Sequence, residues 1–358
     1  MRLFSIPEHR TIPLIALLTA IMGTLFSFHV TMAEPGDAKS LRVAETILLY
    51  QRSSGGWPKN YDREDKLSQK QRAAILSDRN KNDTMIDNGA THREIRLLAA
   101  AYGKTQDKRF RDAALRGIDY LLKGQYKNGG WPQRFPEPQG YAKHITFNDD
   151  AMIGVMSLLR DISDDRQTYS FVSRKTLLEC ADAVARGTTC ILKCQIKVNG
   201  QLTAWCAQHD ENTFLPRKAR SYELASLSGH ESVGIVRFLM HIDQPSPEII
   251  ESIEGAVQWF EQSKLTGIKE VRVKAPDKPG GYDKIVVQDA KAPPLWARFY
   301  DIQKNTPIFC SRDGIPRKTM AEISHERRNN YSWLGQFARD LFAKDLPAWK
   351  KRLERNEK

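Results

Sequence analysis

Gln51-Arg-Ser-Ser-Gly-Gly-Trp-Pro58 and Gln125-Tyr-Lys-Asn-Gly-Gly-Trp-Pro132 are two copies of one turn, and this turn organises the chain. The two tryptophans are 74 residues apart, and a third, Trp205, follows after a further 74 residues. A regular recurrence of this length predicts a repeat architecture. Another glycine turn, Pro279-Gly280-Gly281, follows about one period later.

Segments with apolar residues at helical spacing lie between these turns. They are residues 40–51, 91–102, 108–122, 149–159, 175–192, 230–240 and 249–260. Strand-like alternation is scarce, and its best candidates, 269–274 and 284–288, predict a local hairpin. Two helices per repeat predict an all-α fold, an incomplete (α/α) toroid or barrel with few short strands. The alternative is an irregular helical domain with two duplicated turns.

The first 33 residues differ in composition from the rest. Arg2 and Arg10 give a basic start, residues 12–30 are almost wholly apolar, and Thr31-Met32-Ala33 offers small residues before a cut after Ala33. This order is typical of a secretory signal peptide. The alternative is an uncleaved membrane anchor, because the apolar run is close to spanning length. We expect residues 1–33 to be a signal peptide, and 34–358 to form one domain. We also expect a secreted or periplasmic monomer without stable membrane association after cleavage.

The chain is basic, with 55 Lys and Arg against 43 Asp and Glu, a net charge of +12. A basic surface favours anionic partners such as nucleic acid or an acidic polysaccharide. No nucleic-acid module is visible, and no basic tract is interleaved with aromatic residues. Because the signal peptide indicates export, we expect an acidic polysaccharide and no nucleic acid. The alternative is that the charge serves only solubility.

The five cysteines are an odd number, so at least one is unpaired or pairs between chains. Cys190 and Cys194 would share one face of a helix, where a single disulfide is conceivable. The sequence has no Cys-x-x-Cys pair, and we expect no zinc site.

The Gly-Gly-Trp-Pro turn has two interpretations. Its glycines permit positive φ and close backbone approach, and its proline stiffens the following chain. An exposed tryptophan face, at Trp131 above all, would stack on a sugar ring. The alternative is that these tryptophans belong to the core.

Acidic helix starts follow both turns. Ile86-Asp-Asn-Gly-Ala-Thr91 follows Trp57, and His144-Ile-Thr-Phe-Asn-Asp-Asp-Ala-Met152 follows Trp131. Asp and Asn are common N-caps, which explains each of them singly. Clustered hard oxygen ligands also suit Ca²⁺. The sequence therefore predicts a weak calcium site that substrate carboxylates would complete.

Arginines recur later in the chain, in Ala219-Arg-Ser-Tyr-Glu223, Trp296-Ala-Arg298 and Ser311-Arg-Asp-Gly314. If the repeat returns them to one end of the ring, they would form a carboxylate-binding cluster. The alternative for each is a solvated or salt-bridged surface residue.

With these motifs, the sequence resembles the family 10 polysaccharide lyases, which are pectate lyases with an incomplete α/α toroid. The resemblance runs over residues 40–345. Seven motifs carry it in order: Gly55-Gly-Trp-Pro58, Ile86-Asp-Asn-Gly-Ala-Thr91, Asn128-Gly-Gly-Trp-Pro-Gln133, His144-Ile-Thr-Phe-Asn-Asp-Asp-Ala-Met152, Trp205-Cys-Ala-Gln-His-Asp210, Ala219-Arg-Ser-Tyr-Glu223 and Ser311-Arg-Asp-Gly314. It implies that residues 34–358 are a single pectate lyase catalytic domain.

The resemblance also implies a reaction, a cofactor and roles for particular residues. The reaction is calcium-assisted anti β-elimination of polygalacturonate, which gives 4,5-unsaturated oligogalacturonides. The implied catalytic residues are Arg220, as the base, with Asp149 and Asp87. The implied metal ligands are Asp87, Asp149 and Asp150, and the implied substrate contacts are Arg298, Arg312, Asn88, Trp131 and Tyr222. A guanidinium normally stays protonated, but nearby calcium and arginines would favour the neutral form of Arg220.

Two other functions remain open from the residues. One is an inverting glycoside hydrolase in which Asp87 and Asp149 are the two carboxylates. The arginines argue against it, because hydrolysis needs no carboxylate clamp. The other is a non-catalytic polyuronate-binding protein, which would need neither Arg220 nor the acidic pair.

Overall fold

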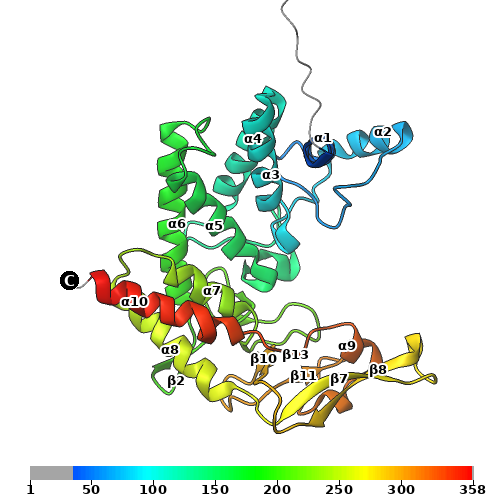
Figure 1. The fold of residues 1–358 in the computed structure, drawn as a ribbon, viewed down its shortest axis with the longest axis vertical. Helices are drawn as coiled ribbons and strands as arrows, with labels where there is room; N and C mark the ends of the chain where they lie inside the picture. Colours follow the sequence, from blue (N-terminus) through cyan, green and yellow to red (C-terminus); the bar gives the residue numbers. More distant parts are fainter. Residues whose placement is uncertain (1–34, 357–358) are drawn as a thin grey trace, which may run out of the picture.

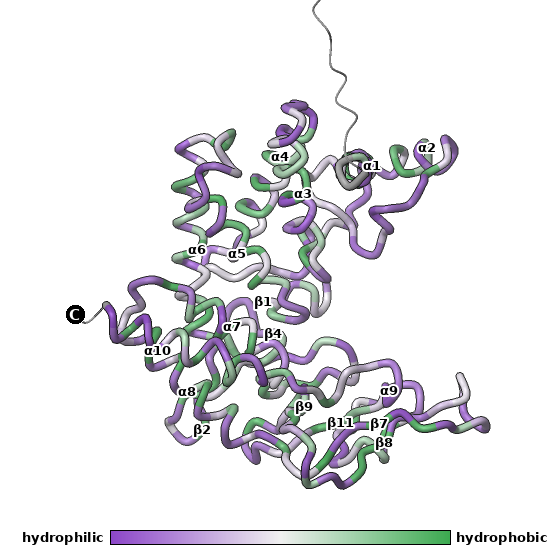
Figure 2. The backbone as a smooth tube through the Cα atoms, in the orientation of Figure 1, coloured by the Kyte–Doolittle hydropathy of each residue, from purple (hydrophilic) through white to green (hydrophobic). Residues whose placement is uncertain are grey.

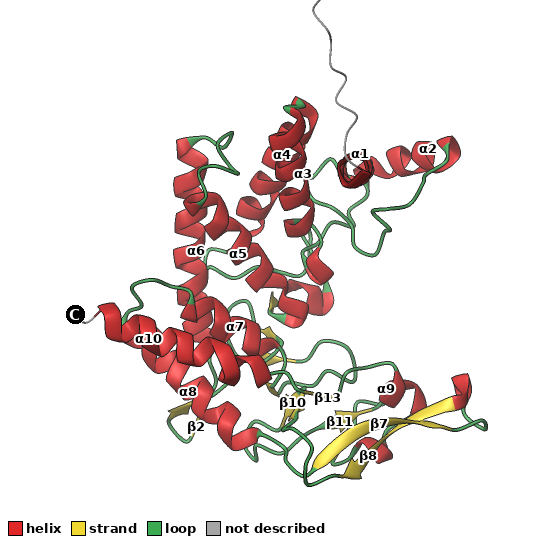
Figure 3. Ribbon diagram, viewed as in Figure 1, coloured by secondary structure: helices red, strands yellow, loops and turns green. Residues whose placement is uncertain are grey.

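The computed structural model describes residues 35–356, and most of its strands lie beside the later helices in the lower part of the view (Figures 1 and 3). The predicted signal peptide lies outside the described residues. The helices are α1 Pro35–Tyr50, α2 Gln69–Ser77, α3 His92–Thr105, α4 Lys108–Gly124, α5 Ala151–Asp164, α6 Arg174–Cys194, α7 Glu231–Met240, α8 Pro247–Ser263, α9 His325–Asn329 and α10 Leu346–Asn356. All seven helices expected from the periodicity are present, and α2, α9 and α10 are additional.

The helices pack in pairs. α3 packs on α4, α5 on α6, and α7 on α8, while α3, α5 and α7 also contact one another in sequence, as do α4, α6 and α8. Alternating green and purple along α5 and α6 shows the amphipathic pattern behind this packing (Figure 2). The result is a two-layered stack of helix pairs with few short strands, as predicted. The described elements form no closed barrel.

A tryptophan ends each unit of the stack in the same way. Its indole Nε1 donates to a backbone carbonyl three residues before the end of the preceding helix. The pairs are Trp57 with Ile47 of α1, Trp131 with Leu121 of α4, Trp205 with Ile191 of α6, and Trp296 with Phe260 of α8, at 2.8–2.9 Å. The fourth unit is therefore marked by Trp296. The glycine turn at 279–281, although it follows about one period after Trp205, forms the tip of an inserted hairpin and not the start of this unit.

The glutamine of each turn ties one unit to the next. Gln51 Nε2 donates to Gly55 O within its own turn and to Ala113 O in α4. Gln125 repeats this pattern with Gly129 and Ala183, and Gln195 with Thr203 and Ser252. The repeated glutamine thus serves the stacking of units.

Gly55 and Gly129 are required by close approach as well as by conformation. Their φ angles are 97° and 93°, and a Cβ on them would lie 2.5 and 2.1 Å from the carbonyl oxygens of Arg116 and Arg186. No other residue type fits such a position without displacing the neighbouring helix.

The strands are short, apart from the predicted hairpin of β7 Ile268–Lys274 and β8 Tyr282–Gln288, which is confirmed. The others are β1 Ile145–Thr146, β2 Lys197–Val198, β3 Gln201–Leu202, β4 Gln208–His209, β5 Pro216–Arg217, β6 Leu227–Ser228, β9 Trp296–Ala297, β10 Phe299–Tyr300, β11 Phe309–Cys310, β12 Pro316–Arg317 and β13 Leu334–Gly335. They pair antiparallel as β1-β4-β5, β10-β6, β11-β12, β13-β9 and β2-β3. These pairings fix the loops that begin α5 and α7.

Two further features concern the described part of the chain. None of its helices combines the length and apolar character that crossing a bilayer requires. The five cysteines are all buried and unpaired there, and burial raises the pKa of the Cys180 thiol to about 12.

Candidate active site

Two short 3₁₀ turns, η2 Asp87–Gly89 and η4 Asn148–Asp150, begin α3 and α5 and contact each other. In both, the middle residue is left-handed, with φ 52° at Asn88 and 50° at Asp149. The turns are held alike, because Met85 N donates to Trp57 O and Thr146 N to Trp131 O. This match makes Asp87 equivalent to Asn148, and Asn88 to Asp149. Asp87 and Asp149 therefore do not occupy equivalent positions, but differ by one residue.

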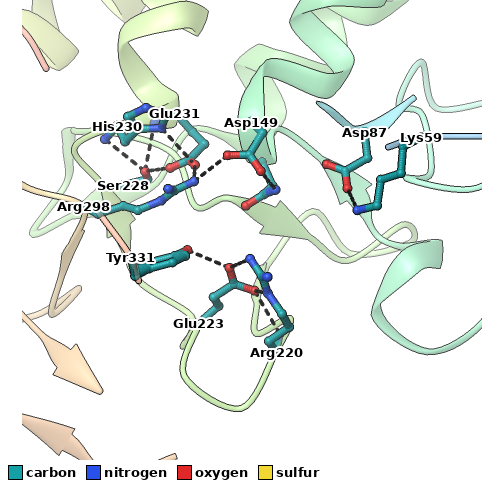
Figure 4. Close-up of polar contacts among 11 residues, drawn as sticks. Lys59, Asp87, Asp149, Arg220, Glu223, Ser228, His230, Glu231, Arg298 and Tyr331 are labelled. Carbon is teal, nitrogen blue, oxygen red and sulfur yellow. Dashed lines mark hydrogen bonds and ion pairs between the residues drawn. The ribbon is translucent and has the colours of Figure 1, made fainter. Parts of the chain in front are cut away.

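Asp87 is a buried carboxylate with one satisfied oxygen. The residue is 2 % exposed, and its Oδ2 forms an ion pair with Lys59 Nζ (Figure 4). Its Oδ1 has no hydrogen-bond partner among the described residues. Lys59 was not predicted as a site residue from the sequence, although it directly follows the Gly-Gly-Trp-Pro turn of the first unit.

Asn148 repeats this arrangement in the second unit. Its Nδ2 donates to Asp149 Oδ2 at 2.8 Å, and its buried Oδ1 also lacks a partner among the described residues. The exposed Asn88, at the position that corresponds to Asp149, completes a group of oxygen-bearing side chains on the two turns.

Arg298 joins Asp149 to the third unit. Its Nη2 donates to Asp149 Oδ1 at 2.8 Å and also pairs with Glu231 at the start of α7 (Figure 4). Burial opposes the ionised form of Glu231, but Arg298, His230 and Ser228 outweigh it and hold the pKa of that carboxyl well below its usual range. Arg298 as a whole is 6 % exposed, so its guanidinium is fixed inside the site by these ion pairs.

Glu231 and His230 were present in the sequence without an assigned role. Burial would lower the pKa of His230, but its hydrogen bond to Glu231 and the charge of that residue raise it. The sequence does not show that a polar residue at the start of an amphipathic helix will be buried. His230 and Glu231 were therefore not identified from the sequence.

Arg220 lies in a second part of the same network. Its Nε donates to Glu223 Oε2 at 2.7 Å, and its Nη2 pairs with the other oxygen of that carboxylate. Tyr331 OH donates to Glu223 Oε1 at 2.7 Å, and the tyrosine ring lies 4.8 Å from the Arg298 guanidinium. Glu223 raises the pKa of Arg220. The expected shift toward neutral arginine is therefore absent, because the hydrogen bond and charge of Glu223 outweigh burial, which lowers the pKa.

Tyr222 packs beneath three arginines. Its ring centroid lies 5.0 Å from Arg220, 5.6 Å from Arg312 and 4.5 Å from Arg327. Because Tyr222 is 3 % exposed, it supports these guanidiniums instead of offering a ring face to substrate, which corrects its prediction as a substrate contact. Arg312 is 64 % exposed at its side chain and pairs with Glu326 at 3.0 Å. Arg327, missed from the sequence, pairs with the same carboxylate.

Trp131 does not form a sugar platform. It is 1 % exposed and its indole is held by Leu121 O. Trp57 and Trp205 are buried in the same way. The stacking prediction for Trp131 is wrong, because the repeated turn inserts each ring between helices.

Some of the side chains on these turns suit a hard cation, and others do not. The predicted trio of Asp87, Asp149 and Asp150 does not gather as one group of ligand atoms within 4.8 Å, whereas Asp149, His230 and Glu231 do. The carboxylate of Asp150 lies against the backbone of α7 at Gly234. The unsatisfied buried oxygens of Asp87 and Asn148 nevertheless offer the hard ligands that calcium prefers.

A second group of ligand-type residues is already neutralised. His144, Asp210 and Glu211 gather within 4.8 Å. Arg217 pairs with Asp210 at 2.7 Å and Lys143 with Glu211 at 3.0 Å. These ion pairs explain the cluster without a metal.

Comparisons with known proteins bear on this site. The profile of the pectic acid lyase family matches residues 51–342. The fold is similar to a solved mutant of a family 10 polysaccharide lyase from Cellvibrio cellulosa in complex with trigalacturonic acid. The identity is 34 %, 86 % of this chain and 93 % of that chain are covered, and the TM-score is 0.74. A second structure of the Cellvibrio cellulosa family 10 lyase is 35 % identical over 84 % and 90 %, with a TM-score of 0.73. A search of curated proteins found no match.

Proposed function

The chain belongs to the pectic acid lyase family and is a polysaccharide lyase that acts on pectate, and on this premise we propose that it cleaves polygalacturonate by calcium-assisted anti β-elimination. The products are 4,5-unsaturated oligogalacturonides. The observation that carries the proposal is the continuous network from Asp149 through Arg298, Tyr331 and Glu223 to Arg220. It places carboxylates and guanidiniums side by side at the ends of successive helical units.

The reaction needs positive charge near the substrate carboxylate. The C5 proton of a uronate is a poor acid until negative charge developing on that carboxylate is stabilised. Calcium, when bound, supplies part of this stabilisation as a Lewis acid. Asp87, Asn148 and Asp149 would hold it, with Asn88 and Asp150 on the same two turns. Arg298, which is buried, and Arg312, which is exposed, supply further positive charge.

Arg220 is the proposed proton acceptor. Its Nε and Nη2 face Glu223, while Nη1 makes no hydrogen bond with the described residues. Nη1 would first lose a proton to solvent, which gives the neutral guanidine, and would then take up the C5 proton of the uronate. Because Glu223 favours the charged guanidinium, this role requires the charge of Glu223 to be compensated by another cation during turnover.

The hydrolase alternative is disfavoured by the ion pairs of the two carboxylates. Asp87 is paired with Lys59, and Asp149 with Arg298. A hydrolase of the inverting type needs one protonated acid and one carboxylate free to activate water. Both carboxylates are already held by cations in the structure, so neither is free to activate water.

Three broader expectations belong to the same proposal. The open stack of helix pairs is an incomplete (α/α) toroid, residues 34–358 form the catalytic domain, and residues 1–33 direct secretion or periplasmic export. The paired helices and the terminal tryptophans of the units support the first. A monomer suffices, since every residue of the network comes from one chain.

Ultraviolet absorbance of the unsaturated uronate tests the function directly. The mature protein is incubated with polygalacturonate in calcium or in EDTA. We expect the chromophore to form with calcium and to be suppressed by EDTA. Absence of the chromophore under every metal condition would refute elimination, and reducing sugar without it would indicate hydrolysis.

A further inference from the structure

Lys59 occupies a distinctive place in the first unit. It follows Pro58 and lies two residues after Trp57. The backbone of Trp57 is held on both sides, because its N donates to Thr91 Oγ1 and its O accepts from Met85 N. The equivalent residue of the second turn is the uncharged, 9 % exposed Gln133. The unit that contains the buried carboxylate is thus the one that carries an ammonium.

The Lys59–Asp87 pair joins a buried anion to a partly exposed cation. The carboxylate of Asp87 is 3 % exposed, whereas the Lys59 side chain is 32 % exposed. An ionised carboxylate that is removed from water requires a compensating charge. In the described residues Lys59 provides it for Oδ2, and Oδ1 remains unsatisfied.

We propose that Lys59 is a displaceable counter-ion. It stabilises Asp87 when no divalent cation is present, competes with the cation for this carboxylate, and binds substrate carboxylates once displaced. This inference rests on the proposed calcium dependence and adds a residue to it. An ammonium and a divalent cation repel each other at contact distance, so binding both to one carboxylate oxygen costs free energy.

The lysine side chain suits exchange between two partners. It is a compact charge on a flexible four-carbon stem, unlike the planar guanidinium of Arg298, which is fixed by two carboxylates. Its partial exposure leaves a path from Asp87 toward the solvent in which a polyanion would lie. Displacement would therefore convert an internal ion pair into a substrate contact.

Calcium binding to the full mature chain tests the proposal without relying on turnover. Isothermal titration calorimetry with CaCl₂ compares the wild type with Lys59→Met, Lys59→Arg and the control Lys66→Met, which alters an exposed lysine. We expect Lys59→Met to bind calcium about tenfold more tightly, a change of about 1.4 kcal/mol. Lys59→Arg and Lys66→Met should resemble the wild type.

Thermal unfolding and kinetics supply the second half of the test. In EDTA, Lys59→Met should unfold at a lower temperature than the wild type, and saturating calcium should remove this difference. At saturating calcium its KM for polygalacturonate should rise several-fold. Equal or weaker calcium affinity of Lys59→Met, measured beside a wild type that binds calcium, would overturn the role of Lys59. A wild type that binds no calcium would instead refute the calcium dependence itself.

Discussion

Arg298 and Asp149 are joined by a 2.8 Å hydrogen bond between Nη2 and Oδ1, and the same nitrogen pairs with the buried Glu231. One guanidinium therefore connects the second helical unit to the third. Tyr331 lies against its face and continues the connection to Glu223. The site is in this sense assembled between units, and its geometry depends on the carboxylates that hold the arginines.

Replacing Glu231 by Gln should weaken both the fold and the reaction. Removal of one partner from a buried ion pair costs about 3–5 kcal/mol, and Arg298 would keep only Asp149. Misplacement of a positioned group commonly costs about 10²-fold in rate. Urea unfolding and kcat/KM measure the two effects. Glu254→Gln, an exposed change on α8, is the control. Normal activity in folded Glu231→Gln would show that Arg298 needs no positioning by Glu231.

Arg220→Ala should reduce kcat by at least about 10³-fold, because it removes the proposed proton acceptor. The substrate should still bind, since Arg298 and Arg312 remain. Elimination rates by ultraviolet absorbance and trigalacturonate binding by calorimetry separate these outcomes. Arg109→Ala, which changes an exposed arginine on α4 that pairs with Glu45 and Asp107, is the matched control. A near-normal rate in Arg220→Ala would assign the base to another residue.

Trp131→Ala should act on stability and spare the affinity for substrate. The ring is 1 % exposed, and loss of a buried tryptophan costs about 3–5 kcal/mol. Unfolding in urea measures the loss, and Trp131→Phe should restore part of it. An increase in KM of a stably folded Trp131→Phe, without loss of stability, would restore the sugar-platform interpretation that the structure contradicts.

The helices were predictable because apolar periodicity and the Gly-Gly-Trp-Pro turn are local signals. The 74-residue spacing fails at the fourth unit, since the β7–β8 hairpin is inserted between α8 and Trp296. The two acidic turns were predicted from the sequence, but not which of their residues correspond. Asp149 and Asp150 are consecutive, and the sequence alone does not show which of them matches Asn88. Contacts such as Arg220 with Glu223 reverse an expected pKa shift, and only the folded chain reveals them.

His209 should make the protein less stable in acid. The residue is fully buried in β4; its Nε2 accepts from Cys206 N at 2.9 Å and its Nδ1 lies 2.7 Å from Phe214 O, so the neutral ring satisfies both contacts. Burial lowers the pKa of His209 from 6.5 to about 4. The unfolded chain therefore binds this proton more readily than the folded protein, and stability falls as the pH decreases from 6.5 toward 4.

The expected loss from His209 is about 3 kcal/mol at its limit, since each pKa unit corresponds to about 1.4 kcal/mol. The loss should be complete near pH 4, where the folded protein begins to bind the same proton. Urea unfolding between pH 7 and pH 4 measures it in the wild type and in His209→Gln, which does not titrate. A second histidine, the partly buried His92, also has its pKa lowered to about 4 by desolvation and by nearby arginines, and it remains in both proteins. The difference between the two pH profiles therefore isolates His209, and parallel profiles would mean that His209 is not held neutral.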